Sequence, residues 1–157
     1  MKKEILEKIN SDSLPLQIAG LDEAITVLDH FTDQLTGLLE TSGDSLFVAE
    51  RISAIMERLQ HKLETTFQET RQEQVRFQIA MIFLTNNNFT KVPYLLKFAT
   101  DTDNISDAIF CLTKMHRKGL PGVKSIAQKW LDKLNDSPLV SDPLKKKDLA
   151  MALQDLV

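Results

Sequence analysis

The sequence predicts an all-α protein of about seven to eight helices, arranged as stacked antiparallel helical hairpins or as a compact bundle. Three observations favour this fold class. Apolar residues recur at helical spacing nearly throughout, glycine and proline number only 5 each, and no segment alternates apolar and polar residues between hairpin turns. A chain of 157 residues has the length of one ordinary domain, so we expect a single domain over residues 1–157.

The first 45 residues predict two helices and a break. The start, MKKEILEKIN, fits a short amphipathic helix. A longer helix follows Gly20, although an earlier start around Pro15 is also compatible with the pattern. Its apolar stripe consists of Leu21, Ala24, Ile25, Leu28, Phe31 and Leu35. TSGDS at 41–45 interrupts it, and Asp44 or Ser45 can cap the next helix by accepting hydrogen bonds from its first backbone N–H groups.

The middle of the chain predicts two more helices. The first has an apolar stripe spaced by three or four residues: Val48, Ile52, Ile55, Leu59 and Leu63. Between 69 and 86 the apolar residues are denser, namely Val75, Phe77, Ile79, Ala80, Ile82, Phe83 and Leu84. This density indicates a central helix that is covered on more than one side. NNNFT at 86–90 ends it, because consecutive asparagines favour a turn.

Four helices are predicted in the C-terminal part of the chain. They span about 89–99, 105–117, 121–135 and 143–156. Pro93 lies in the first turn of the first one, where a missing N–H group costs little. In KGLPG (118–122), Gly119 is placed to end one helix shortly before the next begins.

The net charge of −3 is unevenly distributed. Residues 1–70 hold 13 acidic and 6 basic side chains, whereas residues 111–157 hold 5 acidic and 9 basic ones. An acidic half followed by a basic tail bears on partners more than on fold. The single cysteine, Cys111, excludes an internal disulfide and indicates a cytoplasmic location. No run approaches the roughly 20 apolar residues that span a membrane, so no membrane association is expected.

The stretch DTDN at 101–104 resembles the start of a calcium loop. Such a loop needs oxygen ligands at its first, third and fifth residues, glycine at the sixth and glutamate at the twelfth. Counted from Asp101, these last three positions hold Ile105, Ser106 and Leu112. Asn104 or Asp103 is instead a suitable N-cap, and Asp107 then lies near the positive end of the helix. The stretch is therefore predicted to be a capped turn between packed helices.

No catalytic or metal site is predicted. His30, His61 and His116 lack the spacing of a metal site and are expected on solvated helix faces. Cys111 stands between apolar residues, which indicates a small buried side chain and not a nucleophile. The chain carries no glycine-rich phosphate-binding loop and no nucleophile motif. We therefore expect a protein without enzymatic activity and without a cofactor.

The basic tail raises the alternative of nucleic-acid binding. Its cations are Lys114, Arg117, Lys118, Lys124, Lys129, Lys133 and Lys145–Lys147. Proteins that bind nucleic acids usually add exposed aromatic side chains and an overall positive charge. The obvious aromatic residue in the tail, Trp130, is expected in the core with Val123, Ile126, Ala127 and Leu131. An RNA-binding helical domain is therefore the weaker alternative.

Two segments resemble known helical domains. Residues 92–134, VPYLLKFATDTDNISDAIFCLTKMHRKGLPGVKSIAQKWLDKL, are similar to HEAT-like repeats, in which a leucine-rich helix, an acidic turn and a second helix pack together. This resemblance implies a HEAT-like arrangement and an adaptor that binds a peptide or protein. VKSIAQKWLDKL at 123–134 resembles the last helix of elongation-factor-type helical domains, which bind short peptides.

As a whole, the chain resembles the small all-α immunity proteins of bacterial contact-dependent inhibition and other polymorphic toxin systems. The features are its size, the MKKEI start, the LDEAITVLDHF helix, the lone cysteine and the acidic first half. The resemblance implies a cytosolic inhibitor that binds the C-terminal domain of a toxin, often a nuclease, and blocks its active site. A nuclease presents a positive groove to phosphates, which a carboxylate-rich protein can occupy after steered association.

The expected partner-binding residues are the acidic ones of the first half: Asp22, Glu23, Asp29, Asp33, Glu40 and Asp44. Each of these side chains also has a simpler explanation, which is that it keeps a helix soluble. The leading hypothesis is thus a noncatalytic immunity protein. A HEAT-like interaction adaptor is the alternative from the same sequence.

Overall fold

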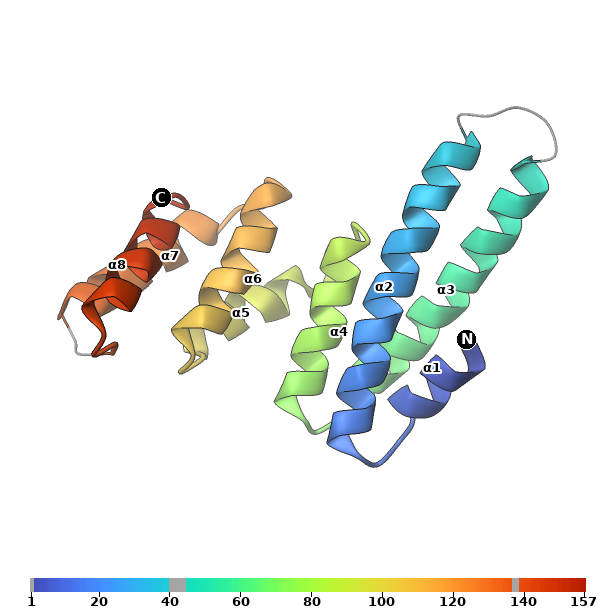
Figure 1. Ribbon diagram of the computed structural model, residues 1–157, viewed down its shortest axis with the longest axis horizontal. Helices are drawn as coiled ribbons and strands as arrows, with labels where there is room; N and C mark the ends of the chain where they lie inside the picture. Colours follow the sequence, from blue (N-terminus) through green and yellow to red (C-terminus); the bar gives the residue numbers. More distant parts are fainter. Residues whose placement is uncertain (1, 40–44, 137–138) are drawn as a thin grey trace. The chain divides into compact units, whose positions relative to one another are not determined.

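The computed structural model describes residues 2–39, 45–136 and 139–157, with the side chains of these residues except those of 2, 31–39, 45–49, 51–53 and 55. The described residues form eight α-helices and one 3₁₀ helix, and no strand occurs among them (Figure 1). The helices are α1 (Lys2–Ile9), α2 (Leu14–Leu39), α3 (Ser45–Glu69), α4 (Glu73–Thr85), η1 (Phe89–Lys91), α5 (Val92–Asp101), α6 (Ile105–Arg117), α7 (Val123–Asp136) and α8 (Pro143–Gln154). The predicted all-α fold class is confirmed.

The chain divides into two compact units, which we call the N-terminal unit (Met1–Thr90) and the C-terminal unit (Lys91–Val157). In each unit, helices that follow one another in the chain pack against one another. Such packing is what a series of helical hairpins produces. The single domain expected from the chain length stays a prediction.

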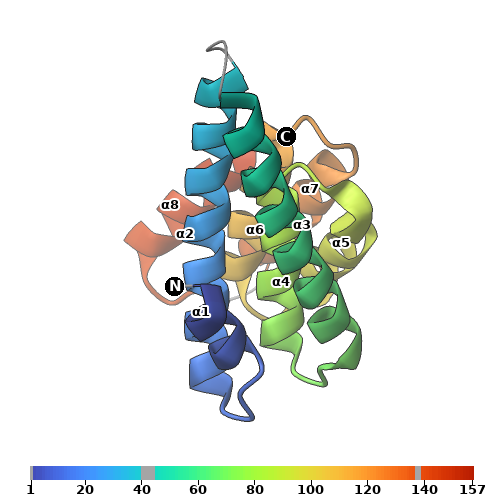
Figure 2. The ribbon, with the colours of Figure 1, turned by 90° about the vertical axis from the view of Figure 1, so that its right-hand side faces the viewer.

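The core of the N-terminal unit forms around α2, which contacts α1, α3 and α4. Helices α2 and α3 run side by side in Figure 1 and again in Figure 2. The core cluster contains Ile5, Ile9, Leu21, Ala24, Leu28, Leu59, Leu63, Val75, Ile79, Ile82 and Phe83. The central helix predicted between 69 and 86 is confirmed as α4, in which every residue from Ile79 to Leu84 is buried.

Helix α2 begins at Leu14, so the earlier of the two starts considered from the sequence is the correct one. Gly20 therefore lies inside the helix and does not precede it. A Cβ atom at Gly20 would lie 2.8 Å from the Lys8 Cβ and 3.0 Å from the Ile9 backbone nitrogen. The glycine is needed because α1 approaches α2 so closely at this point. The predicted caps at Asp44 and Ser45 depend on the TSGDS segment, which lies outside the described residues except for Ser45.

The substitution Gly20→Ala has two opposing effects on stability, a gain in helix propensity and a loss of packing. Alanine favours a helix by about 1 kcal/mol over glycine. The added methyl group, however, forces α1 away from α2, and overpacking of this kind costs about 1–3 kcal/mol. We expect a net loss of stability, measured by urea unfolding followed by circular dichroism. Thr26→Ala, at an exposed position of the same helix, gains helix propensity without a clash and should raise the stability by up to about 0.7 kcal/mol. A Gly20→Ala variant as stable as the wild type would contradict the close approach.

The C-terminal unit has its own core, in which Trp130 is the largest side chain. Its buried residues include Leu95, Ala99, Ala108, Cys111, Leu112, Met115, Val123, Ile126, Ala127, Trp130, Leu131 and Leu134, so the predicted core role of the Trp130 helix is confirmed. The Trp130 indole Nε1–H donates to the Ala99 carbonyl at 2.7 Å. Ala99 lies in the last turn of α5, where carbonyl groups lack partners within the helix. The Trp130 indole of α7 thus supplies a hydrogen-bond donor to a carbonyl group at the end of α5.

The DTDN stretch is a capped turn, as predicted. Helix α5 ends at Asp101 and α6 begins at Ile105. The Asn104 side-chain oxygen accepts hydrogen bonds from the backbone N–H groups of Ser106 at 3.0 Å and Asp107 at 3.2 Å. Asn104 is therefore the N-cap of α6, and Asp107 lies in the first turn, where a negative charge is favourable.

Removal of this cap should destabilise the C-terminal unit. Asn104→Ala leaves two N–H groups of α6 without their side-chain acceptor, and we expect a loss of about 1 kcal/mol in the free energy of unfolding. Chemical denaturation measures the loss. Asp103→Ala is the matched control, since Asp103 is an exposed neighbour and Asn104 carries the cap. Equal effects of the two substitutions would contradict the assignment of the cap to Asn104.

Candidate functional site

Two of the six acidic residues expected to bind a partner have exposed side chains on α2. Asp22 and Asp29 are exposed and lie seven residues apart, which corresponds to about two helical turns, so they share one face of the helix. Thr26, between them on this face, is also exposed. The opposite face carries Leu21 and Leu28, which are buried in the core. The N-terminal core therefore fixes the direction in which the two carboxylates point.

Glu23 has an internal partner. Its carboxylate accepts a charge-assisted hydrogen bond from the Lys8 ammonium group of α1, with 44% of the Glu23 side chain and 36% of the Lys8 side chain exposed. This ion pair joins α1 to α2 close to Gly20. A hollow of about 350 Å³ beside it is lined by Glu4, Glu7, Lys8, Ser11 and Leu16. Of the three acidic residues with described side chains, Glu23 is thus the one engaged within the chain.

The other three predicted residues are described only in part or not at all. Asp33 follows Asp29 by four residues on α2, and its side chain lies outside the described part of the structure. Glu40 and Asp44 lie outside the described residues. Among the described side chains, the predicted acidic surface therefore consists of Asp22 and Asp29, with Glu23 as their neighbour.

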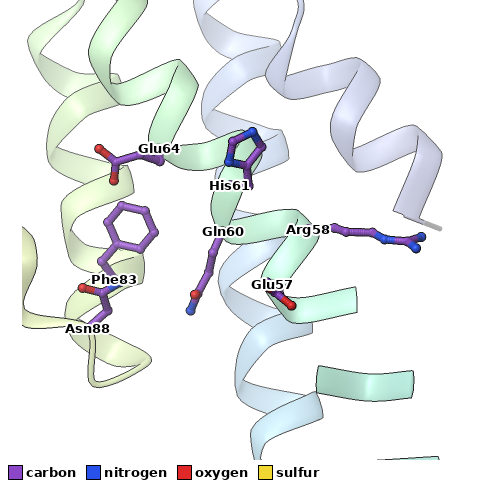
Figure 3. Close-up of a pocket in the computed structure, with 7 residues that line it drawn as sticks. All are labelled: Glu57, Arg58, Gln60, His61, Glu64, Phe83 and Asn88. Atoms are coloured by element: carbon purple, nitrogen blue, oxygen red, sulfur yellow. The ribbon is translucent and has the colours of Figure 1, made fainter. Parts of the chain in front are cut away.

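A groove of about 510 Å³ lies on the same unit, between α3 and the end of α4. Its lining consists of Glu57, Arg58, Gln60, His61 and Glu64 from α3, with Phe83 from α4 and Asn88 after it. In Figure 3 Arg58 extends away from Phe83 and Asn88, whereas Glu64 lies on their side of α3. The Glu64 carboxylate accepts a hydrogen bond from Gln68 Nε2 at 2.9 Å. The lining thus places two carboxylates, Glu57 and Glu64, beside the basic Arg58 and the His61 imidazole, while the Phe83 ring is buried beneath them.

The sequence indicates only some of the residues that line this groove. Glu57 and Glu64 lie within one helical turn of His61, so the sequence places these three side chains together on α3. Phe83 and Asn88 are about 20 residues further on and reach the groove because α4 packs on α3. The available signal in the sequence was the spacing of seven residues between Glu57 and Glu64, which places both on one face of α3. This spacing does not reveal which second helix completes the groove.

The titratable side chains do not form a metal centre within the described residues, where no group of three or more His, Cys, Asp or Glu side chains lies close enough to hold an ion. His30, His61 and His116 are exposed, as predicted. Cys111 is buried, also as predicted, and its Sγ lies 3.7 Å from the Leu95 carbonyl oxygen. Burial raises the pKa of the Cys111 thiol to about 12, so the thiolate needed for nucleophilic attack does not form near neutral pH.

The raised thiol pKa makes stability depend on alkaline pH. The unfolded thiol loses its proton above its ordinary pKa of 9.0, whereas the folded thiol keeps it up to about 12. The unfolded state therefore binds fewer protons in this window, and stability falls as the pH rises from about 9 towards 12, by at most about 1.4 kcal/mol per pH unit.

Cys111→Ala removes this pH-dependent contribution, together with the packing of the Sγ atom, which does not depend on pH. The difference in unfolding free energy between the wild type and the variant should shift in favour of the variant between pH 8 and pH 10.5, as measured by urea unfolding at each pH. Parallel pH profiles for the two proteins would contradict the raised pKa of Cys111.

No helix among the described residues combines the length and the apolar character needed to cross a membrane. Comparisons with models of protein families, with curated proteins and with solved structures found no match to this chain. The chemistry of the surfaces described above is therefore the basis for inferring a function.

Proposed function

We propose that this chain is a noncatalytic immunity protein that binds a cognate toxin domain in the cytosol and covers its active site with the acidic surface of the N-terminal unit. The observation that carries the proposal is the distribution of charge. The N-terminal unit holds 14 acidic and 8 basic side chains, a formal net charge of −6, whereas the C-terminal unit has a net charge of +3. Asp22 and Asp29 display part of that negative charge on one face of a helix that is held by the core.

A nuclease is the class of toxin that an acidic inhibitor suits best. An enzyme that cleaves nucleic acid must attract phosphates, so its substrate groove is lined with Lys and Arg side chains. Carboxylates on the rigid helix α2 offer such a groove a negative surface at little cost in conformational entropy. Long-range attraction between the two surfaces accelerates association, which matters for an inhibitor that must act before the toxin does.

The groove between α3 and α4 supplies a second element of the same proposal. A flat acidic face gives charge complementarity, but tight complexes also need a few side chains that enter pockets of the partner. Glu57 and Glu64 border this groove of about 510 Å³, and their carboxylates can pair with an Arg or Lys side chain of the toxin. The bound cation would lie against carboxylates, with which a guanidinium forms bidentate hydrogen bonds.

An interaction adaptor of the HEAT-like kind remains the second candidate. Its support is that consecutive helices pack on one another in both units, as they do in stacked helical hairpins. Gene neighbourhood separates the two candidates, because an immunity gene lies directly downstream of the gene for a large secreted toxin. An adaptor has no such constraint.

The decisive experiment is co-expression with the toxin domain encoded next to this gene. We expect the wild-type chain to protect the cell and to elute with the toxin domain as one complex. The double substitution Asp22→Asn with Asp29→Asn removes two charges without changing side-chain volume. It should weaken binding by about 2- to 30-fold and lower the association rate most strongly at low salt. Surface plasmon resonance at several salt concentrations measures both effects.

Asp132→Asn with Asp136→Asn is the matched control, because it makes the same change in charge at exposed positions of α7 in the other unit. The control should bind as the wild type does. Absence of both protection and a complex would refute the immunity role. Equal weakening by the two double variants would instead remove the α2 face from the interface.

A further inference from the structure

One face of α6 in the C-terminal unit forms a stripe of exposed and partly exposed residues. Its residues recur at intervals of three and four along the helix, and with Leu149 of α8 they line a groove of about 450 Å³: Ser106, Ile109, Phe110, Thr113, Lys114 and Arg117. The opposite face of α6 carries the buried residues Ala108, Cys111, Leu112 and Met115. The helix is thus anchored by one face and presents the other beside α8.

The middle of this groove is apolar. The Phe110 side chain is 51% exposed, and Ile109 and Leu149 beside it are only partly buried. Phe110 is not among the buried core residues of the unit. Three large apolar side chains that meet in one depression are typical of a contact site for a partner.

The C-terminal end of the stripe is basic. Lys114 places its ammonium group 5.7 Å from the centroid of the Phe110 ring, and the exposed Arg117 follows one turn later. On α8, the exposed Lys145 precedes Leu149 by one turn and thus shares its side of the helix. Cations near the end of α6 also favour its dipole. That effect accounts for Lys114 and Arg117 but not for the exposed phenyl ring next to them.

We propose that this groove docks an acidic amphipathic helix of a partner protein. An apolar side chain of that helix packs on Ile109, Phe110 and Leu149, and carboxylates one and two turns further along pair with Lys114 and Arg117. From the rise of an α-helix, these cations lie about 6 Å and about 10 Å along α6 from Phe110. Glutamates four and seven residues from the apolar anchor match that spacing. The mode of binding is a helix in a groove.

Charge complementarity favours an acidic helix as the occupant of the groove. The C-terminal unit holds 11 basic and 8 acidic side chains, so it attracts acidic segments at a distance. A single-stranded nucleic acid would instead require a row of aromatic side chains on which successive bases stack. Here Phe110 is flanked by the aliphatic Ile109 and Leu149, which suit a leucine or phenylalanine of a peptide. This surface belongs to the C-terminal unit and the acidic face of α2 to the N-terminal unit, and the inference does not rest on the proposed function.

The test uses the full chain and a labelled synthetic peptide of about 16 residues that forms an amphipathic helix, with Leu and Phe along one face and Glu beside it. Fluorescence anisotropy should show saturable binding that weakens as salt is added. Lys114→Gln with Arg117→Gln should weaken it at least about fivefold. Phe110→Ala should have a similar effect, because it removes most of the apolar contact. Both variants should melt like the wild type, since the three residues lie outside the core.

Lys124→Gln with Lys129→Gln is the matched control, because it removes two exposed charges from α7. It should bind the peptide as the wild type does, and so should Asp22→Asn with Asp29→Asn. The proposal is overturned if the peptide does not bind, if a peptide with Lys in place of Glu binds equally well, or if an oligouridine of equal length binds more tightly. It is also overturned if sedimentation shows that the chain self-associates through Phe110, since a second copy would then be the occupant.

Discussion

Helix α4 carries apolar side chains around most of its circumference, and its burial is the constraint on which the N-terminal unit depends. Such a helix must be covered on more than one side, and α2 and α3 both pack against it. Helix α2 can do so only by directing Leu21, Ala24 and Leu28 inward. The face with Asp22 and Asp29 is then necessarily directed to solvent. The position of the acidic face is therefore a consequence of the core and not of any local preference of the carboxylates.

The boundary between the two units coincides with a change in the sign of the charge. An overall charge of −3 conceals a strongly acidic unit and a moderately basic one. The acidic unit offers carboxylates on a helix and in the groove of Glu57 and Glu64, which suit a basic partner. The basic unit offers cations beside an apolar depression at Phe110, which suits an acidic and partly apolar partner. Salt should weaken both kinds of contact, but the apolar component of the second is less sensitive to screening.

The sequence predicts those features that depend on neighbours along the chain. Helical periodicity was sufficient for the all-α fold and for the burial of Trp130, and the turn residues narrowed the cap of α6 to Asn104 or Asp103, because each of these features depends on residues within a few turns. It was ambiguous at Gly20, since a glycine usually marks a helix end and its use in close packing of α1 on α2 is visible only in three dimensions. The two grooves were missed for the same reason. Each combines one helix with a side chain from another, such as Phe83 on α4 or Leu149 on α8.

The hydrogen bond from Trp130 to the Ala99 carbonyl has a practical consequence. Trp130 is the only tryptophan of the chain, and both of these residues belong to the C-terminal unit. Intrinsic tryptophan fluorescence is therefore an optical probe of that unit alone, whereas the helical dichroism signal arises from helices of both units. A single domain would give coincident transitions by the two methods. Two independently folding units would give separate transitions, so the native chain already contains the reporter that distinguishes one cooperative domain from two.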